Sequence, residues 1–282
     1  MTISESAGDP TAGLIPAGAQ PSTREYLHRL WGRRDYMAYT PLGELRARHM
    51  NTVFGNVWHL LNPMLAIGIY WLIFGQILKV DRGVENYIAF LTVGVFTFRF
   101  IQAVVSKGGV SLIKNQELMR SIPFPRAILP TSSLITESLA FVPALVVMYT
   151  VLLLTGELPQ PSWVIPILIF PLEAAFALGA ALIIARIATS FRDIEQILPF
   201  AFRLLFYASA VLFSADRFVE DGPALLLFYL NPIYAFITIT RAAIVGGSVP
   251  GLVLATALIS PVVFLIGGFA FFKQGEGSYA RG

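Results

Sequence analysis

Six long apolar segments alternate with short polar stretches along the chain. They cover about residues 60–78, 87–105, 129–154, 163–185, 194–213 and 252–272. An α-helix rises about 1.5 Å per residue, so about twenty apolar residues cross the roughly 30 Å hydrocarbon core of a bilayer. The pattern therefore predicts an all-α integral membrane protein, with a six-span domain of six transmembrane helices over residues 60–272.

Residues 22–59 show a different pattern, in which apolar and basic positions recur at helical spacing. Ser22–Glu25 fits a capping box, and Thr40–Pro41 restarts a helix with the proline in its first turn. Helices with one apolar and one basic face are typical of the membrane interface, so we expect amphipathic interfacial helices here, with a soluble cap as the alternative. Residues 1–21 are rich in Gly, Ala, Pro and Ser and predict a disordered tail.

Between the fifth and sixth apolar segments, residues 224–230 and 234–244 are apolar but too short to cross a bilayer. Asn231-Pro232 separates them, and proline breaks a helix. The pattern predicts two short re-entrant helices that dip into the membrane from one side. The alternative is a seventh span over residues 223–245.

The basic residues set the orientation, because cytoplasmic loops carry an excess of Lys and Arg. With six spans and both termini in the cytoplasm, fourteen basic residues lie inside and four lie outside. The short re-entrant helices then face outward, and residues 273–282 form a cytoplasmic tail.

Composition narrows the function classes. The chain is 56% hydrophobic and 13% charged, well below the roughly 25% charge of a soluble domain. It has no cysteine, which excludes disulfides, thiolate metal sites and cysteine catalysis. It also contains no phosphate-binding loop, His-Glu-x-x-His or Gly-x-Ser-x-Gly motif. We therefore expect a protein that is not an enzyme and binds no cofactor or metal, and that has an external energy source or none.

Four charged residues lie inside the apolar segments: Arg99, Glu137, Glu173 and Arg203. A charge at membrane depth faces a bundle interior or a wet cavity. These groups either pair with one another as structural supports or line a hydrophilic pathway, and aromatic side chains beside them would suit stacking on sugar rings. The residues assigned to a substrate pathway are Tyr70, Trp71, Phe96, Arg99, Phe206 and Tyr207.

The segment Lys114–Pro130 is the longest polar interruption between two apolar runs. A short helix over about Leu112–Ser121 would expose Glu117 and Arg120 while Leu118 and Met119 face an apolar surface. It is either an ordinary positive loop or a docking helix that transmits force from a cytoplasmic motor. The residues assigned to coupling are Lys114, Glu117, Arg120, Phe124, Arg126, Phe191, Arg192 and Asp193.

Several stretches resemble the permease subunits of ABC polysaccharide exporters. Phe54–Pro63 resembles the family's Leu-Gly-x-x-Trp-x-x-Leu-x-Pro entry to the first span; Asn86–Gly94 is similar to its Pro-Tyr-x-x-Phe-Leu-x-x-Gly; Leu112–Lys114 and Ile122–Pro130 resemble its coupling segment; Phe191–Ile194 and Leu230–Pro232 with Arg241 and Gly246 match two further positions. The likeness runs in order from about Arg34 to Phe272. It departs at Ser209-Ala210-Val211, where the family has Ser-Pro-Val, so the end of the fifth span is expected to be straighter.

The resemblance implies a homodimer of this chain bound to two separate ATPase subunits in the bacterial inner membrane. Such permeases move polyprenyl-diphosphate-linked polysaccharides outward, of the O-antigen, teichoic acid or cell-wall galactan type. It also implies that the two short helices form an outer gate, here with Asn231, Pro232 and Arg241. Membrane lipid and the glycan are the expected further partners, and nucleic acid is not. An ion-coupled secondary transporter and an integral membrane sugar-lipid transferase remain the alternatives.

Overall fold

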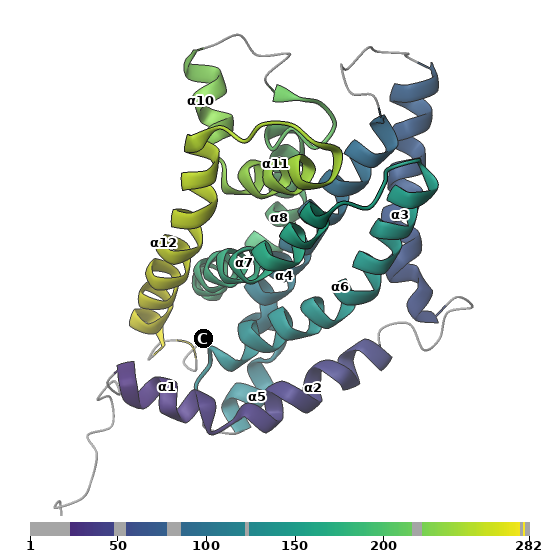
Figure 1. Cartoon of the computed structure of the whole chain (residues 1–282). Helices are drawn as coiled ribbons and strands as arrows, with labels where there is room; N and C mark the ends of the chain where they lie inside the picture. The colour runs from purple at the N-terminus through teal and green to yellow at the C-terminus, as the bar shows by residue number, and fades with distance from the viewer. Residues whose placement is uncertain are drawn as a thin grey trace, which may run out of the picture.

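A computed structural model describes residues 23–47, 55–77, 86–121, 124–215, 222–276 and 279, and every regular element among them is helical (Figure 1). The N-terminal half contains α1 (Thr23–Trp31), α2 (Arg34–Ala47), η1 (Gly55–Val57), α3 (Trp58–Tyr70), the π-helix η2 (Trp71–Ile77), α4 (Tyr87–Lys114), α5 (Gln116–Ser121) and α6 (Ile128–Leu154). The C-terminal half contains η3 (Pro161–Val164), α7 (Ile165–Ser190), α8 (Ile194–Ala208), α10 (Pro223–Tyr229), α11 (Pro232–Val245) and α12 (Gly251–Gly275). The tail predicted over residues 1–21 lies outside the described residues.

Four described helical segments are long and apolar enough to cross a membrane: α4, α6, η3 with α7, and α12. A fifth is counted if α10 and α11 form one span, but the chain bends by 77° between them at Asn231. The remaining two predicted spans are shorter, because α8 ends at Ala208 and α3 passes into η2 after Tyr70. The protein is therefore a multi-pass, all-helical membrane protein in which α10 and α11 are two distinct helices.

Helix α4 is the centre of the bundle. In its most apolar window 78% of the residues are buried, against 22% to 33% in α6, α7 and α12. It packs against α6 and α7 along its length, and it continues beyond the predicted end at Val105 to Lys114. The other long helices thus present most of their apolar surface outward, as expected of helices that contact lipid or another subunit.

Helices α7 and α12 touch backbone to backbone. A Cβ atom added to Gly179 would lie 2.3 Å from the carbonyl group of Phe264, and one added to Gly268 would lie 2.3 Å from the carbonyl oxygen of Gly179. Small residues allow this approach, which gains dispersion energy where lipid supplies no hydrophobic driving force. The two helices therefore form one closely packed pair.

The N-terminal helices α1 and α2 cross the lower part of the molecule in Figure 1, next to α5 and the start of α6. The predicted restart at Thr40-Pro41 is wrong, because α2 begins at Arg34 and continues through Pro41. Pro41 removes one backbone hydrogen bond, but it is buried and α2 packs along α6, which offsets that loss. Thr136 of α6 also donates a hydrogen bond to Glu44 of α2.

Candidate functional site

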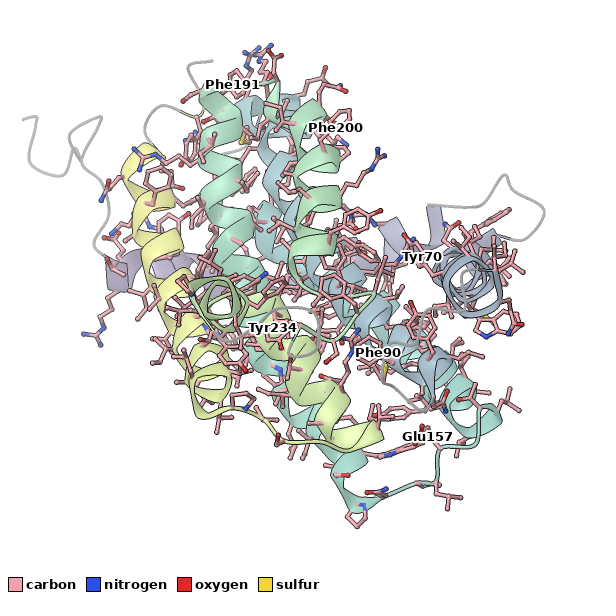
Figure 2. The ribbon with its side chains drawn as sticks, turned by 90° about the horizontal axis from the view of Figure 1, so that it is seen from above. Tyr70, Phe90, Glu157, Phe191, Phe200 and Tyr234 are labelled. Atoms are coloured by element: carbon pink, nitrogen blue, oxygen red, sulfur yellow. The ribbon has the colours of Figure 1, made fainter. Side chains whose placement is uncertain are left out.

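A cleft of about 350 Å³ lies between α3, α4 and α8. Four of the residues predicted for a substrate pathway line it together: Tyr70, Arg99, Phe206 and Tyr207. Tyr70, which is labelled in Figure 2, stacks on Phe206 with ring centroids 5.5 Å apart. Phe206 meets Tyr207 edge to face at 5.7 Å. Arg203, the other arginine predicted within a span, lines the same cleft. Two guanidinium groups and an aromatic wall therefore share one cleft.

Arg99 also lines a second cleft of about 380 Å³ between α3, α4 and α6, where Phe96, Lys107 and Glu137 lie. Glu137 forms a salt bridge of 2.8 Å with Lys107, and its carboxylate is buried while the lysine reaches solvent. Arg99 is exposed and forms no salt bridge with a described residue. The alternative that Glu137 neutralises Arg99 is thus not what the structure shows, and Arg99 opens onto both clefts.

Glu173 lies on α7, is 4% exposed and lines none of the three clefts described here. Within the described part of the chain it forms no hydrogen bond or ion pair. It therefore does not pair with Arg99 either. No group of three or more His, Asp or Glu side chains among the described residues is placed to hold a metal ion.

Trp71 lies apart from the other pathway residues. It lines a third cavity of about 1070 Å³, whose walls include Tyr87, Glu157, Tyr234 and Arg241. The six predicted pathway residues are thus divided among three hollows, of which the cleft between α3, α4 and α8 holds four.

Arg241, predicted as part of the outer gate, is buried and binds backbone. Its guanidinium donates hydrogen bonds to the carbonyl oxygens of Phe90, Ala210 and Val211 at 3.2, 2.9 and 2.6 Å. It also lies 3.4 Å from the centroid of the Phe90 ring, and it sits over Gly94, where a Cβ atom would be 2.4 Å from a guanidinium nitrogen. Arg241 therefore joins α4, α11 and the end of α8.

The end of α8 differs from the sequence expectation. The missing proline predicted a straighter end, but the helix stops at Ala208 and Ala210 takes a positive φ of 48°. Contacts with residues distant in sequence explain why α8 ends here. The carbonyl groups that lose their helical partners at the break accept hydrogen bonds from Arg241 and from Asn231. Asn231 donates to Ala208 at 3.1 Å while its side-chain oxygen accepts from Ile233, which begins α11 behind Pro232.

The two segments predicted for coupling lie next to each other. Lys114 at the end of α4 forms a salt bridge of 3.1 Å with Glu195 in the first turn of α8. This contact brings α5 close to the exposed turn of Phe191, Arg192 and Asp193 between α7 and α8, whose first residue is labelled in Figure 2. Glu195 had no part in the sequence prediction, and its position in the first turn of a helix next to a basic loop was the available signal.

Helix α5 exposes Glu117 and Arg120 and packs its other face inward, as predicted from the sequence. It is shorter than predicted, because α4 continues to Lys114 and α5 begins only at Gln116. Met119 is buried and Leu118 packs beside it in an apolar cluster that also contains Tyr26, Phe272 and Tyr279. The exposed face of α5 thus carries the charged side chains of Glu117 and Arg120.

Phe124 and Arg126, also predicted for coupling, are half-buried within the chain itself. Phe124 packs against the same apolar cluster, and the Arg126 guanidinium donates to the backbone carbonyl of Glu276. Sequence reasoning missed Glu276 and its partner Tyr26. The signal was a single acidic residue in the otherwise Gly-rich and polar segment that follows the last apolar run.

Comparison with known proteins agrees with this architecture. The O-antigen export system permease protein RfbA of Klebsiella pneumoniae is 27% identical over 233 residues, which cover 82% of this chain and 88% of that protein. RfbA of Myxococcus xanthus is 27% identical over 244 residues, 84% of this chain and 91% of the relative. The polysialic acid transport protein KpsM of Escherichia coli is 23% identical over 238 residues, 83% and 91% of the two chains. The sequence model of the ABC-2 type transporter family matches residues 43–245. Because this match covers well over half of the sequence, the chain belongs to the ABC-2 type transporter family.

Proposed function

We propose that this chain is the permease subunit of an ATP-driven exporter that moves polyprenyl-diphosphate-linked polysaccharide outward across the bacterial inner membrane. The observation that carries the proposal is the likeness, over more than four fifths of the chain, to permeases named for O-antigen export. The polysialic acid relative supports a polysaccharide in general. The exporter has six spans per chain, with both termini in the cytoplasm and α10 and α11 as an outer gate.

The cleft between α3, α4 and α8 is the part of the structure that suits such a substrate. Tyr70, Phe206 and Tyr207 offer ring faces for sugars, and Arg99 and Arg203 offer donors for hydroxyl and diphosphate oxygens. An arginine at mid-membrane that faces lipid costs about 2.5 to 3.5 kcal/mol on insertion scales. A second copy of the chain over this cleft would replace lipid with a wet path, which supports a homodimer.

The energy source is a separate ATPase, two copies per homodimer, that binds ATP and Mg²⁺. The chain has no phosphate-binding loop, and the exposed face of α5 with Glu117 and Arg120 offers a mixed-charge docking surface. The neighbouring Phe191 turn extends that surface, joined to it through the Lys114–Glu195 salt bridge. Movement of the ATPase would thus reach α4, α7 and α8 together.

Affinity purification from the native host, followed by transport assays in liposomes, tests the proposal. We expect an ATPase to copurify, the chain alone to hydrolyse no ATP, and charge reversal of Glu117 and Arg120 together to abolish copurification while membrane insertion survives. Arg99→Ala and Tyr70→Ala should each lower glycan export at least about tenfold with copurification intact, since each removes contacts along the path.

Tyr149→Ala is the matched control, because Tyr149 donates to the carbonyl of Trp163 and does not line the cleft. Its export rate should stay within about twofold of wild type if the path is correct. Transport driven by an ion gradient without ATPase would instead indicate a secondary transporter. Transfer of sugar to lipid by the lone chain would indicate a transferase.

A further inference from the structure

The end of α12, the N-terminal helix α1 and the turn that follows α5 meet in one hydrogen-bond network (Figure 1). One carboxylate oxygen of Glu276 accepts the Tyr26 hydroxyl at 2.9 Å and the backbone N–H of Arg126 at 3.0 Å. The Tyr26 hydroxyl in turn accepts the backbone N–H of Ala127 at 3.2 Å. The Arg126 guanidinium closes the network on the backbone carbonyl of Glu276. Three segments that are far apart in sequence are thus held by three side chains, those of Glu276, Tyr26 and Arg126.

This network satisfies the two backbone N–H groups that directly precede α6. Helix α6 begins at Ile128, and the N–H groups of Ile128 and Leu129 bond locally to the carbonyls of Pro125 and Arg126. The N–H groups of Arg126 and Ala127 have no such local acceptor and need one from elsewhere. Glu276 and Tyr26 supply these acceptors from 150 and 101 residues away.

The surroundings fix both side chains. Tyr26 is 2% exposed and meets Phe269 of α12 edge to face at 5.7 Å. Tyr279 donates to the carbonyl of Phe272 at 2.6 Å and covers Gly275, where an added Cβ would lie 2.6 Å from its hydroxyl. Burial raises the pKa of the Glu276 carboxyl above its ordinary range, although the Arg126 and Tyr26 hydrogen bonds oppose that rise. Glu276 follows α12 directly, so the end of that helix carries the carboxylate to the start of α6.

We infer that Glu276 and Tyr26 are positioning residues for the coupling segment, holding the turn between α5 and α6 against α1 and α12 so that movement of α5 reaches both. This inference rests on the proposed docking of an ATPase at α5. The same apolar cluster contains Met119 of α5 and Tyr26 of α1, so the clamp and the docking helix share one packed base. Without the clamp, α5 would move with the ATPase while α1 and α12 lag behind.

Hydrogen exchange of the purified permease, measured without any ATPase, tests the contact itself. In Glu276→Ala we expect the amide of Arg126 to exchange about tenfold faster, because its charged acceptor is lost. Tyr26→Phe should speed the Ala127 amide about fivefold, since it removes one neutral acceptor. Glu276→Gln keeps an oxygen in the same place and should exchange close to the wild-type rate.

The functional readout is the amount of glycan exported per ATP hydrolysed by the permease with its ATPase. Glu276→Ala should lower this ratio about tenfold while ATPase copurification and ATP hydrolysis persist, and Glu276→Gln should restore it. Glu25→Ala is the control, because it removes an exposed carboxylate of α1 that binds Arg29. Exchange and ratio in Glu276→Ala equal to those of Glu25→Ala would overturn the inference, as would equal damage by Glu276→Gln. Failure of the wild-type chain to bind an ATPase would contradict the proposed function instead, and the exchange result would still decide whether the clamp exists.

Discussion

Charged side chains within the apolar helices lie in four different environments. Arg241 is 8% exposed and binds three backbone carbonyls, whereas Arg99 is exposed to two clefts. Glu137 is paired with Lys107, and Glu173 is buried among the helices without a described partner. The sequence shows that each is costly in a bilayer, but not which way it faces, because helical direction depends on the packed neighbours. Only the structure therefore shows that these four residues have different surroundings.

Glu173 separates the exporter from an ion-coupled transporter. Glu173 is buried and forms no hydrogen bond or ion pair among the described residues, so Glu173→Gln keeps its shape, removes no contact and should leave the helix packing unchanged. We expect export by the complex within about twofold of wild type and an equal or higher melting temperature in detergent. Abolished transport with a normal melting temperature would instead assign a proton-carrying role to Glu173.

Glu137→Gln is the comparison for this substitution. It removes the charge that binds Lys107, and because the lysine side chain is 44% exposed we expect a loss of only about 1 kcal/mol of stability. Both variants replace a buried glutamate with glutamine. The difference between their effects on stability therefore measures the salt bridge to Lys107, which only Glu137 forms.

At the scale of elements, periodicity predicted the cores of α4, α6, α7 and α12, where a long apolar run decides the outcome. The break at Asn231-Pro232 was predicted from local chemistry alone, because proline breaks a helix. The sequence predictions failed at Pro41 and at the end of α8, where contacts with residues distant in sequence determine whether the helix continues. The donors that bind the carbonyl groups at the end of α8 come from Arg241 of α11 and from Asn231 at its N-cap, which no local pattern near Ala208 indicates.

The bracing of α8 by Arg241 can be tested at Gly94. Gly94→Ala should destabilise the protein by about 1 to 3 kcal/mol, because the added methyl overlaps a guanidinium that three carbonyls hold in place. Gly68→Ala in α3 is the matched control, since nothing lies within 4 Å of its added Cβ. That variant should be neutral or stabilising by up to about 1 kcal/mol. Thermal unfolding in detergent measures both, and equal melting temperatures would contradict the bracing.

For the whole molecule, the sequence supplied the fold class, the polarity of the loops and the grouping of aromatics with Arg99. It supplied neither the division of the pathway residues among three hollows nor the network around Glu276, because both depend on contacts between residues that are far apart in the sequence. The orientation of the chain in the membrane is a prediction from the distribution of basic residues. This orientation determines on which side of the membrane the turn before α10 and the segment after α11 lie.

Single cysteines test that orientation cleanly, because the chain contains none. Cysteines at Gly222 and Ser248, which flank the bent pair of α10 and α11, should both react with an impermeant maleimide from outside. Both positions are exposed, so accessibility does not limit the reaction. Labelling of position 248 from the cytoplasm alone would make the pair a seventh span and move the C-terminus outside.

The backbone contact between α7 and α12 has a consequence for biosynthesis. Besides the glycine pair, Arg186 of α7 donates to the carbonyl of Phe271, which is made 85 residues later. At about 5 to 20 residues per second, roughly 4 to 17 seconds pass between synthesis of the two sides. During that interval the glycine face of α7 is in the membrane without its partner helix. A nascent chain truncated before α12 should therefore be a preferred substrate of membrane proteases. Packing of α12 against α7 would then be the event that protects the newly made protein from degradation.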